Sequence, residues 1–272
     1  MSFRNLKRRA QERLLSRPEA RRSAVTTEAA TAALDEHEDA FYVPPASCQI
    51  PTLGFLYRLF FGRRADGTFV EIGAYDGHSF SNSSCLAEVG WRGLYVEAVP
   101  EFADLCQKRY AGNERIAVVN AAVSETVGDL TIFVGGPFST ADMETLGEMR
   151  RLEWSRSSFA ENRSVVVPRM PLDSLLAENW IRPRFEVLIV DVEGHEPEVF
   201  DGFDLARWHP QMIIAELVDT HPDLASTRGR HAHLSRTIVG HGYVIVYKDM
   251  INTMFVSRGL FDAAYGEGLR TE

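Results

Sequence analysis

The chain has 272 residues, of which 45% are hydrophobic and 25% charged, as in a soluble globular protein. This length allows one large α/β domain with appendages, or two small domains. The net charge of −9 disfavours nucleic acid as the principal partner, because an acidic body repels phosphates. The three cysteines lack the spacing of a metal or redox site, and no apolar run is long enough to span a membrane. These features predict a cytoplasmic protein.

The amino-terminal segment, residues 1–22, differs from the rest because it carries eight basic groups against two acids. Its apolar residues follow a weakly amphipathic helical pattern. It is either a peripheral anchor to an anionic membrane or a partner, or a solvated leader helix. With the Ala- and Pro-containing linker that follows, it predicts an extension over 1–47 and a folded domain over 48–272.

The first half of the folded domain alternates helical and strand patterns. A helix is predicted over Leu53–Phe61, either packed on the core or forming a homodimer surface. The next predicted elements are strands over Thr68–Ile72, Gly93–Glu97 and Ile116–Val123, with helices over Ser79–Val89 and Pro100–Tyr110. This spacing is typical of βαβ units, and it predicts an α/β, doubly wound, mainly parallel sheet with helices on both faces.

The second half begins with a break in this rhythm. Strands over Leu130–Val134 and Ser164–Arg169 flank a polar stretch, residues 135–163, which is either a substrate lid or a surface insertion. The alternation then resumes with a helix over Pro171–Asn179, strands over Val187–Val190 and Met212–Ala215, a helix over Arg230–Gly240, and strands over Tyr243–Tyr247 and Thr253–Val256.

The loop after the first predicted strand has the position of a cofactor site. Gly73 follows the strand directly, at the edge where open parallel sheets bind ligands. A dinucleotide site needs a second glycine where Tyr75 stands, and the acids Glu71 and Asp76 also disfavour a phosphate. A cofactor with positive charge and no phosphate, such as S-adenosylmethionine, fits this loop better.

A further acid, Glu97, ends the second predicted strand, where a carboxylate can accept hydrogen bonds from two ribose hydroxyls. NAD enzymes use the same device, so Glu97 alone does not distinguish the two cofactors. We expect the backbone beside these acids, at Ala74 and Ala98, to contact the same cofactor.

The fourth predicted strand ends in Asp191, followed by Glu193, His195 and Glu196. Asp191 or His195 could remove a proton from an attacking hydroxyl or amine. Asp191 also faces the expected cofactor, and Glu193 is a candidate for substrate binding. A magnesium ion held by Asp191, His195 and Glu216 is the alternative arrangement.

The remaining histidines and the fifth strand give weaker signals. Glu216 ends that strand and His221 follows it, so both are candidates for substrate binding, although His221 has the alternative of an ordinary loop position. His231 and His233 are two residues apart in a predicted helix, so we expect them to face different sides.

Several of these stretches occur together in one known family. They are Phe69 to Gly77, Gly90 to Gly93 leading to Ala98, Asn120 to Ser124, Pro171 to Leu176, and Ile189 to Gly202. In this order and spacing the chain resembles the FkbM family of S-adenosylmethionine-dependent methyltransferases. The resemblance implies a class I, Rossmann-like methyltransferase sheet of seven strands with the last one antiparallel.

The resemblance also implies a chemistry and a set of residues. Glu71, Gly73 and Glu97 would hold the cofactor, with Ala122 near the adenine. The reaction implied is direct S_N2 methyl transfer to oxygen of a small-molecule or glycan acceptor, on a sugar or natural-product hydroxyl. The alternatives are an N-methyltransferase of the same fold, an NAD-dependent oxidoreductase, which Tyr75 disfavours, and a non-catalytic binding module.

Overall fold

The computed structural model describes residues 48–50 and 52–265, which lie in the second of two compact units, Pro44–Glu272. The predicted extension over 1–47, with its anchor or leader helix, lies outside the described residues and stays a prediction. None of the helices in the described ranges is long and apolar enough to cross a membrane.

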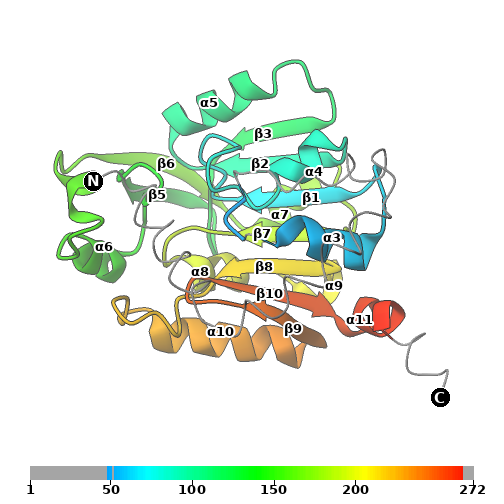
Figure 1. Cartoon of the computed structure of the whole chain (residues 1–272). Coiled ribbons are helices and arrows are strands. Elements are labelled where there is room, and N and C mark those ends of the chain that lie inside the picture. The colour runs from blue at the N-terminus through cyan, green and yellow to red at the C-terminus, as the bar shows by residue number, and fades with distance from the viewer. Residues whose placement is uncertain (1–47, 51, 266–272) are drawn as a thin grey trace, which may run out of the picture. The chain divides into compact units, whose positions relative to one another are not determined.

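Seven strands form the main sheet (Figure 1). In spatial order they are β3 (Ile116–Asn120), β2 (Arg92–Glu97), β1 (Thr68–Ile72), β7 (Val187–Val190), β8 (Met212–Glu216), β10 (Asn252–Ser257) and β9 (Tyr243–Lys248). β1 pairs in parallel with β2 and β7, whereas β10 runs antiparallel to β8 and β9. The predicted class I methyltransferase sheet is confirmed, and its strand order reverses between β1 and β7, where such sheets bind ligands.

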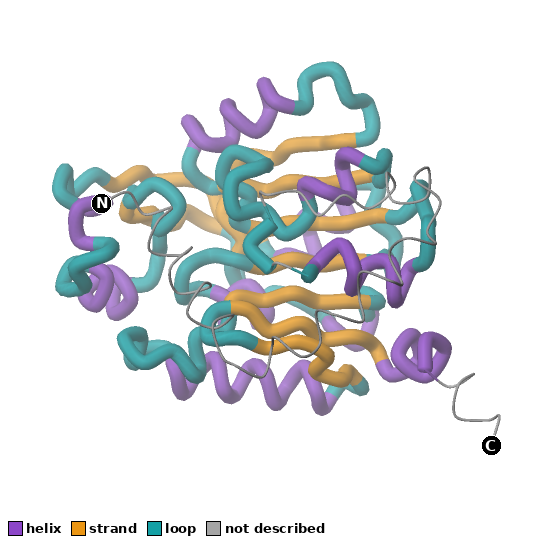
Figure 2. The backbone as a smooth tube through the Cα atoms, in the orientation of Figure 1, coloured by secondary structure: helices purple, strands orange, loops and turns teal. Residues whose placement is uncertain are grey.

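Alternate side chains of the strands enter two different layers, as the period of a strand requires. Val70 and Ile72 join a buried apolar cluster with α7 (Leu172–Glu178), α8 (Glu196–Asp201), α9 (Leu205–Trp208) and α10 (Arg228–Gly240). Figure 2 shows helices on the opposite face as well. These include α3 (Leu53–Phe61) and α4 (Ser84–Glu88), while α5 (Pro100–Arg109) packs against β2 and β3. Glu71 points toward this second layer together with Phe69, because both are out of phase with Val70.

Helix α3 packs on the core, as one of the two predictions for it required. Leu53, Tyr57, Phe60 and Phe61 are buried, whereas Phe55 is 68% exposed. The carboxyl-terminal helix α11 (Arg258–Tyr265) reaches α3, with the Tyr265 ring 6.2 Å from that of Phe60. A homodimer through this helix stays a prediction.

Two predicted elements are wrong in extent. The helix predicted over Ser79–Val89 is confined to Ser84–Glu88, because Ser81, Asn82 and Ser83 turn their polar groups to Glu71 instead of continuing a helix. The strand predicted over Ile116–Val123 ends at Asn120. Its last residues form β4 (Ala122–Val123), which belongs to a second sheet.

This second sheet has three strands in the order β4, β6 (Ser164–Met170) and β5 (Gly128–Phe133). The segment between β5 and β6 contains α6 (Met143–Met149) and a short 3-10 helix, Arg156–Phe159. Leu146, Met149 and Phe159 are buried, so residues 135–163 form a packed segment and not a loose surface insertion. We call residues 135–163 the covering segment.

Candidate functional site

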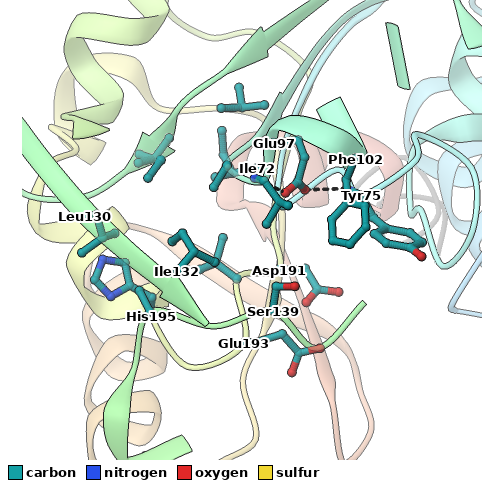
Figure 3. Close-up of a pocket in the computed structure, with 18 of the residues that line it drawn as sticks. Ile72, Tyr75, Glu97, Phe102, Leu130, Ile132, Ser139, Asp191, Glu193 and His195 are labelled. Carbon is teal, nitrogen blue, oxygen red and sulfur yellow. Dashed lines mark hydrogen bonds between the residues drawn. The ribbon is translucent and has the colours of Figure 1, made fainter. Parts of the chain in front are cut away.

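A cleft opens at the carboxyl ends of β1, β2 and β7, between the two sheets, and it encloses about 600 Å³ of space including its mouth (Figure 3). The predicted site residues that line it are Gly73, Tyr75, Glu97, Ala98, Ala122, Asp191, Glu193 and His195. The second sheet and the covering segment add Leu130, Ile132, Gly136, Pro137, Ser139 and Ala141. Leu130 and Ile132 lie in a predicted strand that was not predicted to reach the site, whereas the other four fall in residues 135–163, the stretch predicted to be a substrate lid or a surface insertion.

The loop after β1 fits tightly against the loop after β7. Gly73 has a φ of 85°, and a Cβ atom on it would lie 1.8 Å from the backbone oxygen of Asp191. The Gly73 N–H donates to the Val96 carbonyl, while the Asp191 N–H donates to the Ile72 carbonyl. Only glycine combines this backbone conformation with this approach, so the two loops are held at a fixed separation.

Glu97 stands at the base of the cleft with both carboxylate oxygens in use by the backbone. Oε2 accepts from the Tyr75 N–H at 2.8 Å and Oε1 from the Val99 N–H at 2.8 Å (Figure 3). Burial raises the pKa of Glu97 to about 7, although these backbone donors favour the charged form. Each oxygen keeps a lone pair for a ligand hydroxyl.

Glu71 does not line the cleft, in contrast to the role implied by the family resemblance. Its carboxylate is buried in the layer under α4, where it accepts from the Ser81 and Ser83 hydroxyls and the Asn82 N–H. Burial raises the pKa of Glu71 to about 7 against the opposing effect of these donors. Through these hydrogen bonds Glu71 fixes residues 81–83, near the end of the loop that follows β1.

Ala74 and Asp76 also lie outside the cleft lining. Ala74 is buried, and Asp76 accepts hydrogen bonds from the backbone N–H groups of His78 and Ser79, so it organises the turn. Tyr75 adopts a φ of 49°, lines the cleft, and packs its ring 4.6 Å from that of Phe102.

Three acids gather beside the cleft at the ends of β7 and β8. Carboxylate oxygens of Asp191, Glu193 and Glu216 all lie within 4.8 Å of one another. The pKa of Glu216 is raised well above its usual value, by burial and by the negative charges of Asp191 and Glu193. The geometry therefore places Glu193, and not His195, with Asp191 and Glu216 in the predicted metal group.

Glu216 is buried and, like His221, is not part of the cleft lining. His221 packs instead against Trp154 of the covering segment, with ring centroids 6.5 Å apart, and its Nδ1 accepts from the Asp223 N–H. Neither residue therefore lines the cleft, and their roles in substrate binding stay predictions.

His195 lines the cleft on the side of the second sheet, and Figure 3 shows its ring beside Leu130. Its Nε2 lies 3.0 Å from the Ser124 hydroxyl, and its Nδ1 lies 3.6 Å from Glu198 Oε2. Arg230 pairs with the other oxygen of Glu198. A histidine held between a hydroxyl and a carboxylate is suited to accept and pass on a proton.

A buried pair that the sequence did not reveal supports this loop. Glu196 and His231 are both fully buried, with 3.0 Å between Oε2 and Nε2. Glu196 also accepts from the backbone N–H groups of Val192 and Gly194, and His231 Nδ1 accepts from the Val218 N–H. Because Nδ1 is an acceptor, the proton of a neutral ring is on Nε2, the nitrogen that lies 3.0 Å from Glu196 Oε2.

His233 is exposed on the same helix, so the prediction that the two histidines face different sides is confirmed. The sequence signal for the pair is weak. Glu196 is an acid in the first turn of α8, and no local pattern connects it with His231, thirty-five residues later.

The covering segment is fixed to the loops around the cleft at several points. The Thr140 hydroxyl donates to the Glu193 carbonyl at 2.7 Å, and Arg230 pairs with Asp142 at the start of α6. Glu148 accepts from the Ser226 hydroxyl and backbone N–H. The segment therefore forms one wall of the site.

The charge of the cleft is one-sided. Its lining contains the carboxylates of Glu97, Asp191 and Glu193, and no lysine or arginine is among the described residues that line it. A dinucleotide pyrophosphate would meet negative charge there without a compensating cation. A ligand with positive charge fits this lining.

The sequence profile of the methyltransferase FkbM domain matches residues 71–245. The chain belongs to the FkbM methyltransferase family. The match covers well over half of the chain and includes both loops of the cleft, so the fold and family agree with the resemblance drawn from the motifs.

Solved structures were also compared with this FkbM family member. The methyltransferase FkbM of Methylobacillus flagellatus KT is 14% identical with a TM-score of 0.43, over 73% of this chain and 47% of that one. This chain therefore spans about half of the length of that protein. The O-methyltransferase from Bacillus cereus in complex with SAH is 15% identical with a TM-score of 0.44, over 93% and 97%.

The O-methyltransferase TomG from Streptomyces achromogenes, in complex with SAM, is 15% identical with a TM-score of 0.40, over 75% and 78% of the chains. A search of curated proteins found no match.

Proposed function

We propose that this FkbM family member binds S-adenosylmethionine in the cleft and methylates a hydroxyl oxygen of a sugar or natural-product small molecule. The observation that carries the proposal is the lining of the cleft. It contains three carboxylates, from Glu97, Asp191 and Glu193, and no lysine or arginine among the described lining residues. A sulfonium and an ammonium group are favoured in such a negative site, whereas a phosphate is not.

The lining matches the other parts of this ligand as well. Glu97 offers two lone pairs to a pair of ribose hydroxyls, and it is already oriented by the N–H groups of Tyr75 and Val99. Ala98, Ala122 and Val99 give the neighbouring wall an apolar surface that suits an adenine ring. When bound, the ligand supplies a sulfonium methyl group that an acceptor oxygen can displace in one in-line step.

The remaining work falls to the chain itself. Gly73 and the loop after β7 fix the distance between the donor and the base, so most of the rate arises from positioning. Asp191 or His195 would take the proton that the acceptor hydroxyl loses, with His195 oriented by Ser124 and Glu198. Such a base contributes a factor of about 10²–10⁴.

The acceptor is proposed to be a small molecule or glycan because the body of the chain is strongly acidic, which disfavours nucleic acid. The covering segment supplies the wall against which such an acceptor would lie. Glu193, whose carbonyl accepts from Thr140 of that segment, would bind the acceptor beside this wall.

The experiment is incubation of the full chain with methyl-labelled S-adenosylmethionine and a panel of hydroxyl and amine acceptors, followed by mass analysis for the gain of one CH₂ group. We expect label on a hydroxyl, and a loss of kcat of about 10²–10⁴ in His195→Ala or Asp191→Asn. His233→Ala is the control because His233 is exposed on α10.

Other outcomes contradict parts of the proposal. Transfer to an amine that survives both substitutions would indicate an N-methyltransferase, since a neutral amine needs little base. Binding of the ligand without transfer to any acceptor would indicate a binding module. Absence of binding in calorimetry would reject the cofactor itself.

A further inference from the structure

A second pocket lies at the opposite edge of the main sheet, where β1 and β2 begin. It encloses about 710 Å³ of space including its open mouth. Its lining residues are Thr68, Arg92, Trp180, Arg182, Pro183, Arg184, Phe185 and Glu186. Parallel strands place their amino ends at this edge, so the pocket is separate from the cleft at their carboxyl ends.

The pocket concentrates positive charge without a matching acid. Arg92, Arg182 and Arg184 are exposed, and none of them forms an ion pair within the described residues. The acid of the pocket, Glu186, is already used, because Arg64 pairs with it at 3.0 Å and the Thr68 N–H donates to it at 2.8 Å. Three arginines therefore line one pocket in a chain whose net charge is −9.

The positive charge of Arg184 also acts on a nearby histidine, His209. The pKa of His209 is lowered by burial, and then by the charges of Arg184 and His241. Like charges held together without a counter-ion cost free energy in the free protein, and a bound anion would relieve that cost.

The arginines are also prepared for an oxyanion. The Arg92 guanidinium lies 4.1 Å from the centre of the Trp180 ring. Stacking on an aromatic ring holds this planar group in place without using its N–H donors. Arg184 has a φ of 65°, a backbone conformation that is strained for a residue with a side chain and is often found at ligand sites.

From these contacts we infer that this pocket binds a phosphate group, carried as a monoester or diphosphate on a small ligand or a lipid headgroup. Guanidinium groups match phosphate oxygens with paired hydrogen bonds, and three of them supply more charge than a single carboxylate would need. The pocket is also larger than inorganic phosphate, so it has room for the group to which the phosphate is attached. We call it the arginine pocket.

The test uses the full chain and sodium pyrophosphate in titration calorimetry at constant ionic strength. The variant is Arg182→Ala/Arg184→Ala, and the matched control is Arg151→Ala/Arg236→Ala, which removes two exposed arginines elsewhere. We expect pyrophosphate binding that weakens at least about tenfold in the first variant and is unchanged in the second. Circular dichroism verifies that both variants fold.

A second arm distinguishes the sources of phosphate. Vesicles of phosphatidylcholine with and without phosphatidic acid are sedimented with the same three proteins. Sedimentation that needs phosphatidic acid and also Arg182 and Arg184 indicates a lipid headgroup, whereas pyrophosphate binding without sedimentation indicates a soluble phosphate ester.

Equal behaviour of the two double variants toward both probes, or binding of neither probe to the unchanged chain, overturns the inference. The inference is independent of methyl transfer, because neither probe requires the cleft to be active.

Discussion

Two of the loops that line the cleft are each supported by one buried glutamate. The two carboxylates have different hydrogen-bond and charge partners. Glu71 supports the loop after β1 through hydroxyl and backbone donors alone, and burial raises its pKa to about 7. Glu196 supports the loop after β7 through two backbone N–H groups and the buried ring of His231. In the proposed reaction the loop after β1 is the donor side and rests on neutral groups, whereas the loop after β7 is the base side and rests on a partner from α10.

The two sides should therefore respond differently to pH and to substitution. The Glu71 network is local, since its donors come from the next turn of the chain, and it should be sensitive to proton concentration near neutrality. The Glu196 network joins the ends of β7 and β8 through His231, so its loss should loosen a larger part of the fold.

The largest effect is expected where the two loops meet. Gly73→Ala places a Cβ atom against the Asp191 carbonyl and requires a strained φ, which should lower the free energy of unfolding by about 4 kcal/mol. Chemical denaturation measures this value, and ligand calorimetry should show the loss of the cofactor site. Gly112→Ala is the control, because its Cβ would meet open space. Equal stability of the two variants would mean that the loops are not locked together.

The base side is broken by His231→Ala. The substitution leaves Glu196 and the Val218 N–H without their partner in a fully buried place, so unfolding free energy should fall by about 2–4 kcal/mol. His233→Ala, on the exposed side of the same helix, should change it by less than about 0.5 kcal/mol. We expect kcat to fall more than the affinity for the cofactor, and a loss of affinity alone would refute the assignment of this pair to the base side.

The donor side is tested by the pH dependence of stability. A glutamate with a folded pKa of about 7 and an ordinary value of 4.5 binds its proton more tightly in the folded chain. Its contribution is full below pH 4.5 and is lost as the pH rises toward 7, with a loss of about 1 kcal/mol between pH 6 and 8. Glu97, whose pKa burial also raises to about 7, contributes a similar decline. Denaturation of Glu71→Gln over this range should therefore show a decline that is smaller by about 1 kcal/mol, whereas Glu88→Gln, at an exposed site in α4, should match the parent chain. Parallel curves for both variants and the parent chain would contradict the prediction.

The smallest effect is expected from the covering segment. Glu148→Ala removes hydrogen bonds to Ser226 that are partly exposed to water, so stability should fall by only about 0.5 kcal/mol. The acceptor KM should rise about two- to threefold, because this factor corresponds to about 0.5 kcal/mol of binding free energy. Glu153→Ala, exposed in the same segment, should leave KM unchanged. A tenfold rise in KM would show that the segment holds the acceptor much more firmly than its contacts indicate.

The sequence predicted the main sheet well because its central strands are buried on both faces, and because β2, β7 and β8 end at or just before an acid. Strands such as Val187–Val190 give a short apolar run followed by Asp191, and the structure brings Glu97 and Asp191 to the same edge. Local patterning was enough for these features, since each depends on neighbours in the chain.

The rest depended on contacts between distant residues. The polar run Ser81 to Ser83 resembles the start of a helix in the sequence. In the structure its hydroxyls donate hydrogen bonds to Glu71 instead. Glu196 pairs with His231, and Ala122 belongs to the second sheet. Both arrangements are set by packing between distant residues, which local sequence patterns do not reveal. The predicted cofactor-binding role of Glu71 rested on its position in the motif. The direction of its side chain depends on the same distant contacts.

The contact between Gly73 and the Asp191 carbonyl has a consequence for engineering. Because it sets the spacing between the two loops, a larger or smaller acceptor cannot be accommodated by moving the base relative to the donor. Room for a new acceptor has to come from the wall that the covering segment forms with Pro137, Ser139 and Ala141. Libraries that aim to change acceptor choice should therefore diversify that wall and leave the two strand-end loops as they are.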